Sequence, residues 1–256
     1  MRQLAAFTKK EFTDVIRTGK FYILLVIFVI FGIMNPAVAK LTPWIFELLS
    51  DSMKQQGISI GNFIVTAMTS WEQYYKNLSM EFIVFVVMFC PILASEYQKG
   101  TLINMLTKGL PRWKVIAAKS IALFVMWSFY YWIAFGITFG YTAYFWDNSI
   151  VSNLWFAVVC PYLFGIWLIS LIMMFSVIFN TSTAVLLSTG AVYTVAYIIS
   201  VIPTAIDYLP IKLTLGMELL TKSTSISNYT IAIFITLGLI LINLIFTILT
   251  FNKKKV

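Results

Sequence analysis

Residues 148–206 read NSIVSNLWFAVVCPYLFGIWLISLIMMFSVIFNTSTAVLLSTGAVYTVAYIISVIPTAI, and none of these 59 residues is charged. A helix needs about 20 apolar residues to cross the hydrocarbon core of a membrane. The stretch is therefore long enough for two crossings, with the polar run Asn180-Thr181-Ser182-Thr183 at the turn between them. It predicts helices whose solvent is mostly lipid.

The composition of the whole chain supports the same interpretation. Of the 256 residues, 60% are hydrophobic and 11% are charged. A soluble domain has roughly 45–50% apolar and ~25% charged residues. This difference excludes an ordinary cytosolic enzyme and a disordered chain. We expect an all-α polytopic membrane protein that forms a single transmembrane domain over residues 1–256.

Other charge-free runs occur at residues 21–39, 120–146 and 223–252. Between Glu81 and Glu96 only 14 residues are uncharged, which is too few to span. The second crossing must therefore include residues before Glu81 and hold that carboxyl inside its outer end. Six spans are expected, at residues 21–39, 78–95, 120–146, 154–179, 184–206 and 229–251.

The basic residues indicate the orientation of these spans. With both termini in the cytoplasm, five Lys or Arg residues lie inside in residues 1–20, five in 96–119 and three in 252–256, against five in the outer loops. Cytoplasmic loops carry the excess of Lys and Arg in membrane proteins. We therefore expect a multi-pass protein of the cell membrane. Topology then accounts for the net charge of +8, and no nucleic-acid partner is expected.

Three segments outside the spans have patterns of their own. In residues 1–20 an interfacial helix is expected, with Ala5, Phe12, Val15 and Ile16 on one face. This helix either only sets orientation or contacts a cytoplasmic partner. Residues 40–77 predict short helices at the outer surface, over 41–56 and 62–76. Residues 207–228 are too apolar for a free loop and suit a segment that re-enters the bilayer edge.

Several kinds of site are missing from the sequence. There is no His, which excludes His-based acid–base catalysis and His-containing metal sites. The G-x-x-x-x-G-K-[ST] loop that cradles ATP phosphates does not occur either. We therefore expect no cofactor bound by this chain and no enzymatic site in it. If ATP drives the protein, another chain must bind it.

The segment 96–119 carries the clearest functional pattern. It begins E-x-x-x-G-T-L at Glu96 and ends with Lys119, where the third span starts. Gly100 can turn the chain out of the second span, and Thr101 can cap a following helix. Apolar residues then recur at helical spacing, namely Leu102, Ile103, Leu106 and Leu110. Such an amphipathic helix between two spans lies on the membrane or docks in a partner's groove.

This pattern resembles the coupling segment of ABC transporter permeases of the type-two exporter family. Those permeases have a Glu at the cytoplasmic end of the second span, a Gly-Thr-Leu turn, a short helix, a Pro/Arg pair and a Lys entering the third span. The six-span plan and the N-terminal helix also match. The positions that match the family's coupling segment are Glu96, Gly100, Thr101, Leu102, Leu106, Arg112 and Lys119.

The resemblance implies a mechanism and a set of partners. Two permease copies, here expected to be a homodimer, face each other in the lipid, and two ABC ATPase subunits dock below. ATP and Mg are held by the ATPase pair, whose closure moves the coupling helices and switches the spans between inward and outward states. The scarcity of charge in the spans favours a hydrophobic or amphipathic cargo, with a membrane-active peptide preferred over a lipid or a drug.

Two other functions are open on the sequence alone. An intramembrane prenyl or acyl transferase would need clustered acids, His or a metal site. A passive channel or structural membrane protein would not need the helix between the second and third spans. A stable ATP-hydrolysing partner distinguishes the first interpretation from both.

A few side chains inside the spans are candidates for a cargo path. Glu81 is either at the headgroup level or part of a cation relay. Asn243 and Thr247 share a helical face and are expected to bond to a neighbouring helix. The basic tail, Lys253–Lys255, is expected to be dispensable for export. The candidate cargo-path residues are Glu81, Trp127, Tyr131, Phe135 and Asn243.

Overall fold

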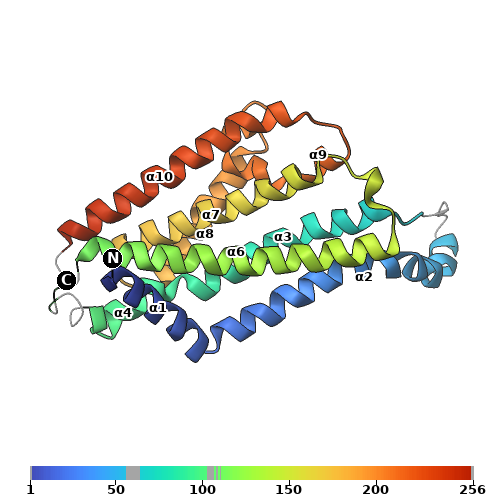
Figure 1. Cartoon of the computed structure of the whole chain (residues 1–256). Coiled ribbons are helices and arrows are strands. Elements are labelled where there is room, and N and C mark those ends of the chain that lie inside the picture. The colour runs from blue at the N-terminus through green and yellow to red at the C-terminus, as the bar shows by residue number, and fades with distance from the viewer. Residues whose placement is uncertain (1, 56–63, 103–106, 108, 110, 255–256) are drawn as a thin grey trace.

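The computed structural model describes residues 2–55, 64–102, 107, 109 and 111–254, and these form helices joined by turns and short loops, with no strand among them. Six helices in the described part are long and apolar enough to cross a membrane. This confirms the predicted all-α, six-span architecture. Both termini lie at one end of the bundle, together with α1 and α4 (Figure 1).

The chain order gives the bundle its layout. A short helix, α1 (Arg2–Arg17), turns at Gly19 into the long α2 (Lys20–Gln55). The chain returns through α3 (Ala67–Phe89) and α4 (Pro91–Gln98), which together form one span, and goes out again in α6 (Arg112–Phe145). The short helix η1 (Asn148–Ile150), then α7 (Leu154–Ile178) and α8 (Ser182–Ile199) follow. The last span is α10 (Thr230–Lys253).

Two helices extend further than the charge map predicted. The first runs unbroken to Gln55 through Pro36 and Pro43, so the separate outer helix expected over 41–56 is wrong as far as the described residues reach. The third element starts at Ala67 and includes most of the other expected outer helix. The ion pair between Glu72 and Lys76, 2.7 Å across one helical turn, lets two charges lie on a continuous helix.

The early start of α3 changes the position of Glu81. This residue lies 14 positions after the start of the helix, about 21 Å along its axis at 1.5 Å per residue. Its side chain is fully buried, and neither carboxyl oxygen has a hydrogen-bond partner among the described residues. Glu81 therefore lies well inside the helix; whether it is at the headgroup level or part of a cation relay stays a prediction.

The N-terminal helix is present, and the face that packs overlaps the expected one in part, since Phe12 and Val15 lie against the core. Phe7 and Glu11 are its buried residues, whereas Ala5 and Ile16 are exposed. Because residues four apart share a helical face, Phe7 and Glu11 point together onto the side of α6. The helix is thus an integral part of the bundle.

The segment between α8 and α10 is also packed. It contains η2 (Ile206–Tyr208), η3 (Pro210–Thr214), α9 (Met217–Leu220) and η4 (Ile226–Tyr229), and these lie against α7 and α10. Its buried side chains include Leu213, Leu219 and Leu220. This agrees with a segment too apolar for a free loop; its depth in a bilayer stays a prediction.

A hydrogen-bonded network joins α2, α3 and α6. Asn35 donates to the Thr138 hydroxyl at 3.0 Å, Thr138 donates to the Gly32 carbonyl, and Asn77 donates to the Asn35 side chain at 2.7 Å. Bonds between polar side chains in lipid fix helices relative to each other.

The helix α8, by contrast, buries few residues, so its packing constrains it least.

Trp127 of α6 fills the centre of the bundle. Its ring lies 5.2 Å from that of Phe85 and 5.6 Å from that of Phe82, and its indole N–H donates to the Tyr162 carbonyl at 3.1 Å. Gly165 of α7 makes room for the ring, because a β-carbon at this position would come within 2.2 Å of it. The absent side chain therefore sets the distance between α6 and α7.

We expect Gly165→Ala to destabilise the bundle by about 1–3 kcal/mol, the usual cost of overpacking a core. The methyl group would displace the Trp127 ring and strain its bond to α7. Thermal unfolding of the purified protein, followed by size exclusion, checks this. Gly136→Ala is the matched control, since a β-carbon there meets nothing within 4 Å. Equal unfolding midpoints for the two variants would contradict the packing role of Gly165.

Candidate functional site

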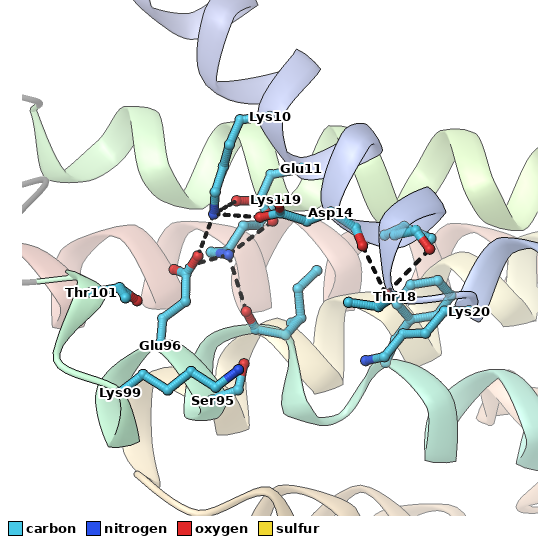
Figure 2. Close-up of a pocket in the computed structure, with 13 residues that line it drawn as sticks. Lys10, Glu11, Asp14, Thr18, Lys20, Ser95, Glu96, Lys99, Thr101 and Lys119 are labelled. Atoms are coloured by element: carbon cyan, nitrogen blue, oxygen red, sulfur yellow. Dashed lines mark hydrogen bonds and ion pairs between the residues drawn. The ribbon is translucent and has the colours of Figure 1, made fainter.

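Four ionised side chains from three helices meet at the end of the bundle that holds the termini (Figure 2). They are Lys10 and Glu11 of α1, Glu96 of α4 and Lys119 of α6, and we call them the charge cluster. The Lys119 ammonium lies 2.9 Å from Glu11 and 3.0 Å from Glu96. The Lys10 ammonium lies 2.7 Å from Glu96 and 3.1 Å from Glu11. Each carboxylate therefore faces two ammonium groups.

Burial makes this pairing obligatory. The side chain of Lys119 is 1% exposed, and those of Glu11 and Glu96 are 6% and 11% exposed. A charge withdrawn from water this far is costly unless it is paired and hydrogen-bonded. Lys119 also donates to the Ile92 carbonyl at 3.0 Å, which adds a third partner.

Lys10 is the more exposed of the two cations in the charge cluster, and it balances the second carboxylate charge. Burial alone would lower the pKa of Lys10, but its hydrogen bond to Glu96 and the carboxylates of Glu11 and Asp14 outweigh burial and raise the pKa above its ordinary value. The Asp14 carboxylate lies 2.9 Å from this ammonium. Lys10 therefore stays charged at any physiological pH.

A break in the second span positions Glu96. Pro91 has no N–H to continue the helical ladder, and α3 ends at Phe89 before α4 begins. Two lysines from other helices bond to carbonyls on either side of the break, Lys20 to Met88 at 3.1 Å and Lys119 to Ile92. The cations brace the break and present Glu96 to α1 and α6.

The turn after Glu96 is as the sequence predicts. Gly100 has φ +66°, in the left-handed region that favours glycine, and it follows directly on the end of α4. Leu102 is fully buried, so the start of the segment 96–119 is anchored in the core. Thr101 lines a cavity beside Glu96; its capping role stays a prediction. Leu106, with Ile103, lies outside the described residues.

Arg112 has a different environment from Glu96 and Lys119. Its guanidinium donates to the carbonyl of Phe251, at 3.0 Å, and to that of Lys254. It thereby caps the C-terminal end of α10. Lys254 in turn donates to the Val177 carbonyl and to Asn180, and its ammonium lies 4.4 Å from the Tyr97 ring centre. These contacts argue against a dispensable Lys254, although export itself is the test.

The candidate cargo-path residues are all buried in the bundle, and their role in a cargo path stays a prediction. Trp127, Tyr131 and Phe135 are buried among other helices, and the Tyr131 hydroxyl donates to the Val158 carbonyl at 2.6 Å. Asn243 donates to Ser170 of α7 at 3.0 Å, which confirms its predicted bond to a neighbouring helix. Thr247 bonds to its own helix, at the carbonyl of Asn243, so the prediction is wrong for Thr247.

The structure shows an apolar cavity elsewhere, of about 530 Å³ between α3, α7 and α8. Phe82, Val86, Leu168 and Leu186 are among its lining residues. Sequence reasoning did not single these residues out, because in a chain this apolar they look like any lipid-facing or core position. It also missed Lys10 and Glu11, although an acid four residues after Phe7 on a basic helix marks a buried partner.

Lys119→Met removes the most buried cation of the cluster. We expect it to destabilise the protein by about 3 kcal/mol, because Glu11 and Glu96 are then left with only Lys10. The double variant Glu11→Gln/Lys119→Met restores the balance of charge and should unfold at a higher temperature than Lys119→Met alone. The thermal midpoints of the unmodified protein, of Glu11→Gln, of Lys119→Met and of the double variant form a double-mutant cycle that measures this coupling.

Lys114→Met is the control, since Lys114 also lies on α6 but makes an exposed bond to Gln3. It should change the midpoint little. Additive effects of Glu11→Gln and Lys119→Met would show that the cluster does not act as a unit.

Comparison with known proteins adds the family. A search of curated proteins found no significant match. The family model described as ABC-2 family transporter protein matches residues 5–256, which is nearly the whole chain. With its six membrane-spanning helices, the chain belongs to the ABC-2 transporter family and is a multi-pass membrane permease.

Proposed function

We propose that this permease is the transmembrane subunit of an ATP-driven exporter, with both termini in the cytoplasm, and that ATPase subunits bind the segment 96–119. The charge cluster is the observation that supports this best. It ties Glu96, where the segment begins, to α1 and to the start of α6 through contacts of 2.7–3.0 Å.

The cluster gives the coupling segment a mechanical connection to the spans. A displacement of the segment passes through Glu96 to Lys119 on α6, and from there to Glu11 on α1. Gly100 allows the turn, while buried Leu102 prevents the segment from moving independently. Such a link couples two sites only if its contacts differ between two states. Rearrangement of the cluster is the change we assign to the ATP-driven step.

An exporter needs an ATP site and a second transmembrane subunit, and partner chains supply both. ATP and Mg are held by two copies of a separate ABC ATPase, since the sequence carries no phosphate-binding loop. A second permease copy, forming a homodimer, completes the transporter. The apolar faces of the outer helices contact membrane lipid.

For the cargo, we propose a hydrophobic or amphipathic molecule, with a membrane-active peptide first and a lipid or drug second. The cavity between α3, α7 and α8 supports this choice. Its walls are mostly aliphatic and aromatic, with the hydroxyls of Thr189, Tyr193 and Thr194 as polar points. A site of this kind suits a ligand with a large apolar surface. Because α8 is weakly packed, it is the helix that can move to admit such a ligand.

The test uses tagged permease purified from the membranes of its source cells. We expect an ATPase to copurify, with vanadate-sensitive ATP hydrolysis. Glu96→Ala and Gly100→Pro should keep insertion and the ATPase but uncouple hydrolysis from export, because each changes the turn into the coupling segment. Export is measured as survival of cells challenged with a panel of membrane-active peptides.

Glu72→Ala is the matched control, since it removes an exposed acid of the same span at the far end. It should leave export unchanged. Absence of any copurifying ATPase, or unchanged survival in both coupling variants, would refute the proposal. If an ATPase copurifies but the coupling variants change survival for none of the peptides, the peptide cargo alone is refuted.

A further inference from the structure

A cavity of about 330 Å³ lies beside the charge cluster, between α1, the start of α2 and α4. Its lining residues include Lys20, Lys99, Thr18, Ser95 and Thr101. In Figure 2, Lys20 and Lys99 extend on the side of the cavity away from the paired carboxylates. The two lysines reach this space from different helices, α2 and the end of α4.

The charges around the cavity are unequally matched. Its lining holds four lysines, Lys10, Lys20, Lys99 and Lys119, against three acids, Glu11, Asp14 and Glu96. All three acids are paired with Lys10 or Lys119 at 2.7–3.1 Å. Lys20 donates to the Met88 carbonyl, and neither it nor Lys99 has an ion pair with any described acid. One positive charge is in excess.

The unpaired lysines also act on each other. Lys20 and Lys99 line the same cavity, and like charges repel. An anion between Lys20 and Lys99 would relieve this repulsion, and the Ser95 and Thr101 hydroxyls can donate to it. Among biological anions, a phosphate group offers several acceptor oxygens to donors that converge from different sides.

We propose that this cavity binds a phosphate group through Lys20, Lys99 and the hydroxyls of Ser95 and Thr101. The proposal is independent of the cargo and of the ATPase. A bound phosphate links the start of α2 to the last turn of α4, one residue before Gly100. It thereby restrains the turn into the coupling segment.

The position of the site favours a phospholipid headgroup as the source. Lys20 is the first residue of α2, and the next residues along this helix include the exposed apolar side chains Tyr22, Ile23 and Val26. Acyl chains can lie along this face below a headgroup at Lys20. Free inorganic phosphate shares the same chemistry, so the test includes it as a separate arm.

Purified protein in detergent is titrated with short-chain phosphatidylglycerol, with phosphatidylcholine, and with inorganic phosphate at constant ionic strength. Binding is read from the thermal midpoint and from lipid adducts in native mass spectrometry. We expect phosphatidylglycerol to raise the midpoint more than phosphatidylcholine does. Lys99→Gln should weaken its binding about fivefold, the effect of one lysine on an anionic headgroup.

Lys9→Gln is the matched control, because Lys9 is an exposed lysine at the same end of the bundle but does not line the cavity. Its loss should change affinity less than twofold. Stabilisation by inorganic phosphate that Lys99→Gln abolishes would also support the site and would identify free phosphate as a source. No stabilisation by either ligand, or equal losses in the two variants, would overturn the proposal.

Discussion

A single ammonium group determines how one end of this bundle is built. Lys119 is 1% exposed, so its charge must be balanced where it lies. The balance comes from Glu11 on the N-terminal helix and Glu96 at the end of the second span, and both acids share Lys10. Three elements that are far apart in sequence are thus held together by one electrostatic requirement. The turn at Gly100 and the cavity with Lys20 and Lys99 both adjoin this junction.

The sequence predicted the architecture well because each helix that crosses a membrane requires a long apolar stretch with few charges. Six apolar stretches and the turn at Gly100 are readable from the spacing of charged and small residues. The first residue of α3 could not be read from the sequence in this way, because an ion pair such as Glu72–Lys76 makes two charges tolerable on a continuous helix. Counting charges treats each charge as a boundary, and the start of this helix was placed too late for this reason.

The contacts of the candidate site residues were harder to predict than the residues themselves. In the sequence, Glu11 is one acid among basic residues, and only the packing of α1 on α6 shows its bond to Lys119. Arg112 belongs to the segment 96–119 in the sequence, and only the structure shows its bond to the Phe251 carbonyl at the end of α10. Both contacts join residues more than a hundred positions apart. Periodicity describes one helix at a time, so contacts of this kind appear only in three dimensions.

The length of α2 has a consequence for the opposite end of the molecule. Its 36 residues correspond to about 54 Å of helix, well beyond the ~30 Å of a hydrocarbon core. Its base lies beside the charge cluster, while its tip lies at the far end of the bundle (Figure 1). The helix is therefore roughly 24 Å longer than a hydrocarbon core is thick, so at ordinary tilts part of it lies outside the lipid chains.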